Sequence, residues 1–185
     1  SRGLGDVYKR QMDTHTVFDM ASVSKSISTA ICTLILTERG QLRLTDPVNL
    51  YLPAFSEEIR ITDLLTHTSG LPAYAPVNKL VEQYGSPNPE GLIEYIAGCK
   101  PVFKPGSDFQ YSCLNYIVLQ HIIETISGQS LRNFAKANIF DPLGMSHTDY
   151  CPTGEILEHC APTEKQKDGS VLKGVVHDPL ARIMN

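Results

Sequence analysis

The stretch Ala21–Ser28, "ASVSKSIS", places a serine and a lysine three residues apart where a polar segment gives way to a long apolar run. From Ser22 to Ile35 apolar residues recur every three or four positions, and a glycine follows soon after. This spacing predicts one helix over about residues 22–39. The preceding "TVFDM", Thr16–Met20, is short and rich in β-branched and aromatic residues, which predicts a strand end. We therefore expect a strand-to-helix junction here, with Ser22 in the first turn of the helix.

Composition narrows the class of protein. The chain has 185 residues and is 42% hydrophobic, which is typical of one globular domain. It has 16 Lys and Arg and 20 Asp and Glu, and the two signs of charge are interspersed along the chain. No nucleic-acid partner is therefore expected. The longest apolar stretch, Ala30–Leu36, is far shorter than the roughly 20 residues of a bilayer span, so no transmembrane segment is predicted. Five cysteines without a CxxC pair favour free thiols.

Both ends of the chain look cut. Residues 1–11, "SRGLGDVYKRQ", have no hydrophobic period and resemble a cloning or assembly remnant, so they are interpreted as non-native. The last residues, "GVVHDPLARIMN", stop without a helix stop signal. Residues 12–185 are accordingly interpreted as a partial domain, truncated at both ends. The compartment stays open between cytoplasmic and extracytoplasmic, because the true N-terminus is missing.

Further elements follow from caps and stops. A short helix capped by Thr62 is predicted in "RITDLLTHTSGLP", and Pro72–Pro89 is read as a long surface loop. Three more features are predicted: a helix after Asn88 and Pro89, a strongly apolar helix that ends at Gly128, and a helix capped by Ser130. "KQKDGSVLKGVV" resembles a hairpin that turns at residues 168–169.

Ser22 and Lys25 can form a reaction centre. A serine in the first turn of a helix faces the positive end of the helix dipole and unpaired N–H groups, which favour an alkoxide. A lysine three residues on shares the same helical face, and a buried lysine amine is a plausible base. The alternative is a plain N-cap serine, because the SxxK pattern is common. Ser170 and Lys173 match it as well, but they follow an Asp-Gly turn and open no apolar helix.

Several segments in order then carry a resemblance. They are "FDMASVSKSIS", "LLTHTSGLP", "YSCLNYIVLQHIIETISGQS", "IFDPLGMSHT" and "GVVHDP", which together extend from about Thr16 to Ala181. In this order they resemble the serine β-lactamase and penicillin-binding-protein-like superfamily, which contains class C β-lactamases, DD-peptidases and related esterases. The resemblance implies an α+β, β-lactamase/DD-peptidase-like fold. This chain would hold a mostly helical part of it and lack most of the central antiparallel sheet.

The resemblance also implies roles for individual residues. Ser22 would be the acylated nucleophile, and Lys25 and Tyr111 would move protons. Cys113 stands where the Tyr-x-Asn motif of the family has a substrate-binding asparagine, and a thiol is a weaker hydrogen-bond partner than an amide. A Lys-Thr-Gly or His-x-Gly strand, which would supply the second oxyanion N–H, is absent from the sequence. Losing one such donor costs about 2.7 to 4 kcal/mol of transition-state stabilisation.

Other polar residues have structural interpretations. His67 lies at a helix end beside a turn and is expected to fix the loop, and His121 on an apolar helical face is expected to be a core histidine. Ser86–Asn88 could imitate a Ser-x-Asn element, but its Pro/Gly context favours a turn and a helix cap. A zinc site is an alternative in one segment, although its spacing matches no standard knuckle; the residues concerned are His147, Cys151, His159 and Cys160.

These observations predict a serine hydrolase that acts through an acyl-enzyme on an ester, a peptide-like amide or a β-lactam. The substrate would be a small molecule or peptidoglycan-like, and no metal or organic cofactor is implied. The fragment itself is expected to be weakly active or inactive. The alternatives are a non-catalytic binding or cell-wall-sensing homologue of the same fold and, less favoured, a zinc-stabilised interaction domain.

Overall fold

The structure, a computed structural model, describes residues 12–84 and 88–184; the interpretation of residues 1–11 lies outside them. In chain order its helical elements are η1 (Lys25–Ala30), α1 (Ile31–Glu38), η2 (Val48–Leu50), α2 (Ile61–Leu65), α3 (Val77–Tyr84), α4 (Pro89–Ala97), α5 (Cys113–Ser127), α6 (Leu131–Ala135), η3 (Lys136–Phe140), α7 (Gly154–His159) and α8 (Pro179–Ile183). Of these, η1 and η3 are π-helical and η2 is a 3₁₀ turn.

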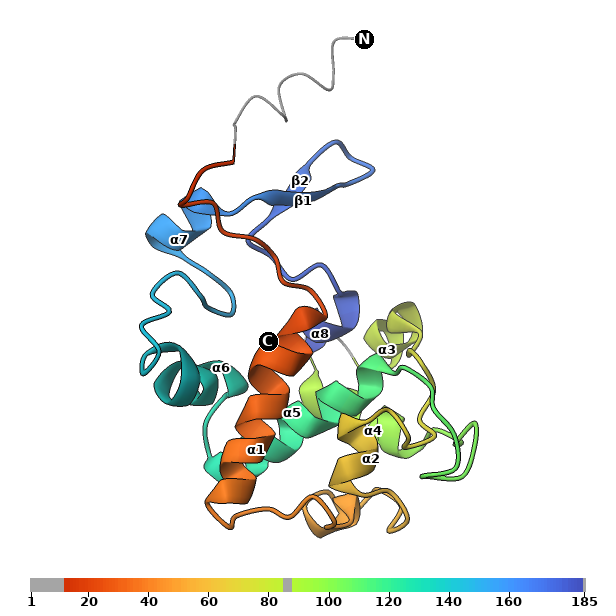
Figure 1. Ribbon diagram of the computed structural model, residues 1–185. Helices are drawn as coiled ribbons and strands as arrows, with labels where there is room; N and C mark the ends of the chain where they lie inside the picture. Colours follow the sequence, from red (N-terminus) through yellow and green to blue (C-terminus); the bar gives the residue numbers. More distant parts are fainter. Residues whose placement is uncertain (1–11, 85–87, 185) are drawn as a thin grey trace.

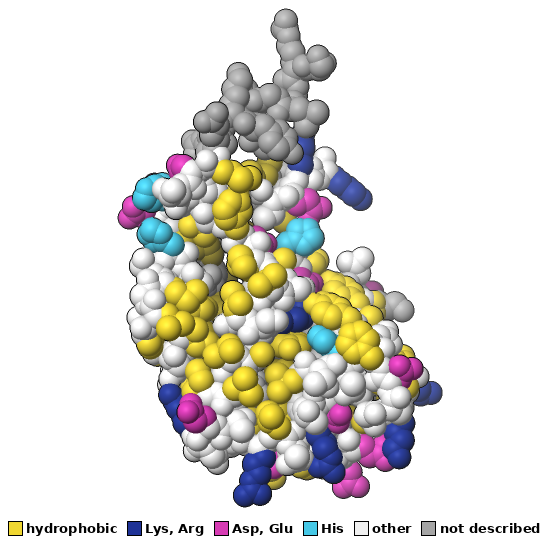
Figure 2. Space-filling view, in the orientation of Figure 1, with side chains coloured by type: hydrophobic (Ala, Val, Ile, Leu, Met, Phe, Trp, Pro, Cys, Tyr) yellow, Lys and Arg dark blue, Asp and Glu magenta, His cyan; other side chains and the backbone are white. Residues whose placement is uncertain are grey.

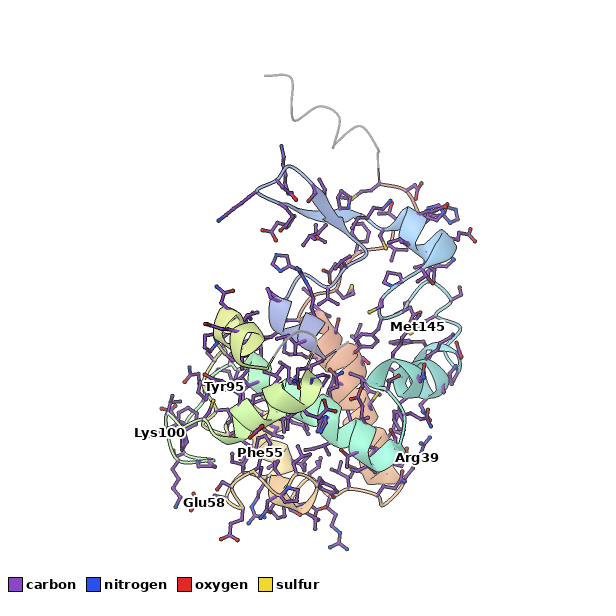
Figure 3. All side chains as sticks on the ribbon, turned by 180° about the vertical axis from the view of Figure 1, so that it is seen from behind. Arg39, Phe55, Glu58, Tyr95, Lys100 and Met145 are labelled. Atoms are coloured by element: carbon purple, nitrogen blue, oxygen red, sulfur yellow. The ribbon has the colours of Figure 1, made fainter. Side chains whose placement is uncertain are left out.

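Helix α5 lies at the centre of the helical body. It contacts η1 together with α1, α2, α4 and α6, which surround it in Figure 1. Its fully buried residues include Leu114, Val118 and Ile122, whose four-residue spacing places them on one face. Gly128 ends the helix in the left-handed conformation at φ 66°, where glycine has no Cβ penalty. Seen from behind, side chains fill the space between these helices (Figure 3).

The helix that begins after Ser22 agrees with the predicted residues 22–39 but differs in winding. Its first part, η1, is a π-helix, and α1 continues it to Glu38. Thr33 and Leu36 on α1 are buried against the core. Short π-helical segments inside helices are rare and often occur at functional sites. Here the segment begins at Lys25, three residues after Ser22.

One side of this helix is not covered within the described residues. Val23, Ile31 and Leu34 are 50%, 39% and 46% exposed, although their spacing is that of a buried stripe. Figure 2 shows hydrophobic side chains gathered over this helix on the face that Figure 1 presents. An apolar stripe of this kind normally packs against another layer of secondary structure.

The described residues contain one sheet, made of two strands. β1 (Pro162–Lys165) and β2 (Val171–Lys173) pair antiparallel, with Pro162 opposite Lys173, which confirms the predicted hairpin. The predicted strand end at Thr16–Met20 is reduced to a single parallel bridge between Val17 and Cys160. The mostly helical α+β arrangement predicted for part of the domain is therefore confirmed.

Two local predictions are wrong. The segment Pro72–Pro89, expected to be a loop, contains α3, whose apolar residues recur at helical spacing between flanking prolines. The N-cap of α2 is Arg60 rather than Thr62, because the Asp63 carboxylate accepts the Arg60 N–H at 2.9 Å and caps the helix from within. By contrast, the Asn88 and Ser130 caps are confirmed, since both side chains accept backbone N–H bonds.

Candidate active site

The backbone just before Ser22 is strained and leaves one N–H unused. Ala21 has φ 44°, a region that L-residues other than Asn and Asp rarely adopt, and its N–H is held by the Asp19 carboxylate at 2.8 Å. The N–H groups of Val23 and Ser24 both donate to backbone carbonyls. Within the part of the chain that the structure describes, no hydrogen bond uses the N–H of Ser22. An unpaired N–H at the start of a helix is available for a developing negative charge.

Ser22 and Lys25 are in direct contact. The side-chain nitrogen of Lys25 donates to the Ser22 hydroxyl at 3.2 Å. Ser22 is exposed and Lys25 is half-buried, so the hydroxyl is accessible while the lysine is partly shielded from water. This contact is short enough for proton transfer between the two groups.

Tyr111 lies beside the same lysine. The Lys25 nitrogen is 5.4 Å from the centroid of the Tyr111 ring and 6.0 Å from that of Tyr116. Tyr111 lies two residues before the start of α5 and is 44% exposed. The structure thus brings together Ser22, Lys25 and Tyr111, the three residues predicted to be catalytic. Among the described residues, no hydrogen bond joins the Tyr111 phenol to Ser22 or Lys25. The contact between Tyr111 and Lys25 is a cation–π contact with the tyrosine ring.

His67 belongs to the same cluster, although the sequence predicted only a loop-fixing role. Its ring centroid is 4.5 Å from that of Tyr111 and 5.2 Å from that of Tyr116. Its Nδ1 accepts the N–H of Ser112 at 3.2 Å, so His67 holds the segment just before α5 in place, in agreement with the predicted structural role. Burial lowers the pKa of His67, and the nearby Lys25 lowers that pKa further.

Cys113, predicted to bind substrate, is the first residue of α5. Its N–H donates to the carbonyl of Ala73 at 3.1 Å, and its thiol is half-buried. This places the thiol two residues after Tyr111 at the helix start. Its contact with substrate stays a prediction.

The second SxxK pair does not form a comparable site. Ser170 donates its hydroxyl hydrogen to Asp168 at 2.7 Å, and Lys173 donates to the carbonyl of Glu158 at 2.8 Å. Both residues lie on the hairpin and are engaged with other partners. Context therefore separates the two pairs as the sequence predicted. The Ser86–Asn88 alternative lies partly outside the described residues, and Asn88 itself caps α4 by accepting the Gly91 N–H at 2.7 Å.

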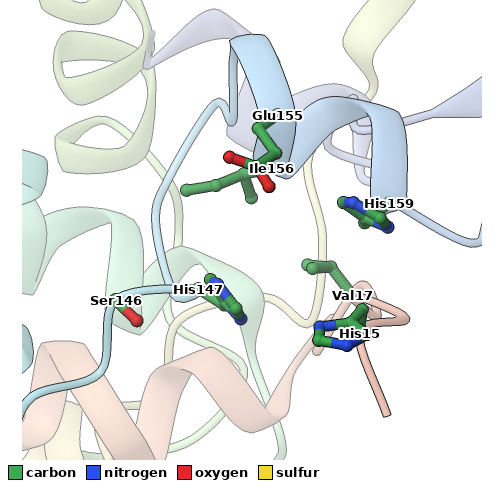
Figure 4. A pocket seen from close by; sticks show the side chains of 7 residues that line it. All are labelled: His15, Val17, Ser146, His147, Glu155, Ile156 and His159. Carbon is green, nitrogen blue, oxygen red and sulfur yellow. The ribbon is translucent and has the colours of Figure 1, made fainter. Parts of the chain in front are cut away.

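A separate cavity of about 280 Å³ lies between the start of the described chain and α7 (Figure 4). It is lined by His15, Val17, Ser146, His147, Glu155, Ile156 and His159. Of the four residues that suggested zinc, His147 and His159 line this cavity, whereas Cys151 and Cys160 do not. In the described ranges no group of three or more His, Cys, Asp or Glu side chains is placed to hold a metal ion. The zinc alternative is therefore not supported by the geometry.

Comparison with known proteins decides the family. A family model described as Beta-lactamase matches residues 2–182. The chain belongs to the beta-lactamase family. An N-acetylmuramyl-L-alanine amidase of Bacillus subtilis (strain 168) is 30% identical over 186 residues, which cover 93% of this chain and 42% of that protein. The chain thus spans less than half the length of the curated relatives it matches.

Solved structures support the same assignment to the beta-lactamase family. A penicillin binding protein from Bacillus halodurans superposes with a TM-score of 0.71 at 26% identity, covering 91% of this chain and 54% of that one. A beta-lactamase/D-alanine carboxypeptidase from Yersinia pestis superposes with a TM-score of 0.74 at 22% identity over 96% of this chain and 50% of that one, which shows the fold alone. As for membrane spans, none of the described helices has the length and apolar character that crossing a bilayer requires.

Proposed function

We propose that this chain carries the nucleophile and the proton-transfer groups of a serine hydrolase that works through an acyl-enzyme. The observation that carries the proposal is the 3.2 Å contact between the Lys25 nitrogen and the Ser22 hydroxyl at the start of a helix. Tyr111 lies against the same nitrogen. A hydroxyl in contact with a base, and a second proton-transfer group beside that base, are the parts that an activated serine needs.

In the proposed reaction, the Ser22 oxygen attacks the carbonyl carbon of the substrate while its proton passes to Lys25 in the amine form. The N–H of Ser22 supports the negative charge that develops on the carbonyl oxygen. Collapse of the tetrahedral intermediate breaks the bond to the leaving group, which takes a proton from Lys25 or Tyr111. Water, activated by the same groups, then hydrolyses the ester on Ser22 and restores the enzyme.

The proposed substrate is an ester, a peptide-like amide or a β-lactam. The names of the matched relatives, an amidase and a penicillin binding protein, support carbonyl substrates related to peptidoglycan. Cys113 favours general acyl transfer over β-lactam turnover, because a thiol is a weaker hydrogen-bond partner than the family's amide. We propose that the rest of the domain supplies the second oxyanion N–H and the sheet that covers the apolar face of α1. The described part alone would then react slowly.

Covalent labelling with a fluorophosphonate probe tests the proposal. The probe should attach to Ser22, located by mass spectrometry of the labelled peptide, in this chain and faster in a chain extended to the length of its relatives. Ser22→Ala should abolish labelling, whereas the matched Ser170→Ala in the second SxxK pair should leave it unchanged. If a fully extended chain binds penicillin without forming an adduct on Ser22, the proposed serine-hydrolase activity is wrong. That result would favour the second candidate, a non-catalytic binding homologue, for which Cys113 is the supporting observation.

A further inference from the structure

Two N–H donors converge on one nitrogen of His67. The N–H of Ser112 lies 3.2 Å from Nδ1, and the side-chain nitrogen of Asn115 lies 3.1 Å from it. A backbone N–H can only donate, so Nδ1 of His67 must accept and carries no proton. The neutral imidazole therefore has its proton on Nε2.

The orientation of the Asn115 amide follows from the groups on its two sides, Ser69 and His67. The N–H of Leu71 donates to the Ser69 hydroxyl oxygen at 3.0 Å, and that hydroxyl donates to Oδ1 of Asn115 at 2.6 Å. Because Nδ1 of His67 accepts the Ser112 N–H and carries no proton, the Asn115 group that faces it is the NH₂ group, which donates to Nδ1. Ser69 and Asn115 are 1% and 0% exposed, so water does not compete for these bonds.

The same histidine also holds the other side of Tyr111. Its carbonyl accepts the N–H of Gln110 at 3.0 Å, while its Nδ1 accepts the N–H of Ser112. Gln110 and Ser112 are the two chain neighbours of Tyr111. His67 is thus bonded on both sides of the tyrosine, and its ring packs against the Tyr111 ring at 4.5 Å between centroids.

The backbone of His67 adopts an unusual conformation to make these contacts. Its φ of 60° lies in the left-handed region, where non-glycine residues are uncommon. Such strain persists only where the surroundings determine it, and here the surroundings are the hydrogen bonds to Gln110, Ser112 and Asn115.

We infer that His67 is a positioning residue for Tyr111: its carbonyl and its neutral imidazole hold the peptide groups on both sides of the tyrosine and keep the phenol ring beside Lys25. This inference rests on the proposed function. His67 does not touch the substrate in this role; it acts through Tyr111. The ionisable groups that face it are Lys25 from η1, Tyr111 and, from α5, Tyr116. Burial and the Lys25 charge keep the pKa of His67 low, which favours the neutral form that the bonds require.

Two substitutions separate positioning from packing. His67→Asn keeps an acceptor oxygen near the place of Nδ1 and tolerates a positive φ, but it removes the ring. His67→Ala keeps the backbone carbonyl and leaves the donors of Ser112 and Asn115 without their acceptor. Because Ser112 and Asn115 are fully buried, those unpaired donors should shift the segment that carries Tyr111.

The test compares rates of fluorophosphonate labelling at Ser22. His67→Ala should label about tenfold to a hundredfold more slowly than the wild type, since small displacements of a reacting group have effects of this size. His67→Asn should remain within about fivefold of the wild type if the acceptor is what matters. His121→Ala, a half-buried histidine bonded to none of the site residues, is the matched control and should label at the wild-type rate.

Nitrogen-15 NMR of the imidazole gives a readout that needs no activity. The wild-type spectrum at pH 7 should show His67 protonated on Nε2 and unprotonated on Nδ1, with the Ser112 amide proton shifted downfield. A proton on Nδ1, or an asparagine variant as slow as the alanine variant, would overturn the inference. If His67→Ala does not fold, the NMR assignment of wild-type His67 and the labelling rate of His67→Asn still test the inference. A wild type that never labels at Ser22 rejects the proposed function instead, while the NMR result continues to test the His67 geometry.

Discussion

The side-chain nitrogen of Lys25 lies over the ring of Tyr111, 5.4 Å from its centroid, while it donates to Ser22 at 3.2 Å. One nitrogen therefore connects the nucleophile with the tyrosine that precedes α5. A positioned proton-transfer group contributes about a hundredfold to ten-thousandfold in rate. The first prediction tests this connection at Lys25.

Removal of Lys25 should nearly abolish acylation. Lys25→Ala should slow fluorophosphonate labelling of Ser22 by about a hundredfold or more, because the hydroxyl loses its base. Lys25→Arg should not restore the rate, because a guanidinium stays protonated and cannot accept the serine proton. Lys173→Ala in the second SxxK pair is the control and should label like the wild type. Equal labelling of Lys25→Ala and the wild type would mean that Lys25 is not the base.

Cys113→Asn should favour amide and β-lactam substrates. An amide side chain at the start of α5 offers both a donor and an acceptor to a substrate, which a thiol does poorly. We expect acylation by a penicillin to rise about tenfold relative to a simple ester, roughly the value of one good hydrogen bond. Cys113→Ser, smaller and without an amide, is the matched comparison. A ratio unchanged by asparagine would place position 113 outside the substrate site.

Ala21→Gly should stabilise the protein and slow the reaction. At φ 44° an alanine side chain is strained, and glycine should gain about 1 kcal/mol, or about 2–4 °C in melting temperature. The freer backbone should hold Ser22 less firmly, so labelling should slow by roughly threefold to tenfold. Cys151→Gly removes a similar strain at φ 48° on an exposed residue away from Ser22, and it should raise stability without changing the labelling rate. If both variants changed the labelling rate equally, the backbone strain at Ala21 would have no specific effect on Ser22.

Local patterns in the sequence predict one half of the site well. Ser22 and Lys25 lie one helical turn apart, so their contact follows from spacing, and the start of the helix follows from the change in hydrophobic period. Tyr111 is predicted only from the order of motifs along the chain. Its approach to Lys25 depends on how α5 packs against η1, which no local pattern determines.

The role of His67 could not be predicted, because its partners are distant in the chain. Ser112 is 45 residues away from it, and the left-handed φ at His67 depends on that packing. A different signal was available for α3. Its apolar residues have helical spacing, but the surrounding prolines and glycines dominated the interpretation. The periodicity also does not predict that Val23 and Ile31 are partly exposed, because their spacing is that of buried positions.

The cysteines should differ sharply in reactivity. Burial raises the pKa of the Cys32 thiol to about 11, and Cys32 is 0% exposed, so iodoacetamide at pH 8 should not modify it in the folded protein. The exposed Cys151 should react within minutes under the same conditions. Peptide mapping by mass spectrometry measures both, and unfolding in urea should make Cys32 reactive. Modification of Cys32 in native buffer as fast as that of Cys151 would contradict its burial.

The ion pair between Arg132 and Asp149 should contribute its full stability above about pH 4 and lose it as the pH falls further. Arg132 donates to both carboxylate oxygens, at 2.9 and 2.6 Å, and this bonding lowers the pKa of Asp149. Because its folded pKa is below the unfolded value of about 3.9, the stabilisation is present above that value and is lost as the pH falls through the folded pKa.

Asp149→Asn should therefore lower the free energy of unfolding by about 1 kcal/mol at pH 7, a value kept small because the arginine is 41% exposed. The difference from the wild type should be smaller at pH 3 than at pH 7. Asp141→Asn is the matched control, because Asp141 pairs with Lys136 at a more exposed position, and it should change stability by less than about 0.5 kcal/mol. Urea unfolding of the three proteins at both pH values measures these differences. A loss at Asp149→Asn that persists undiminished at pH 3 would show that packing, rather than the carboxylate charge, is what this residue contributes.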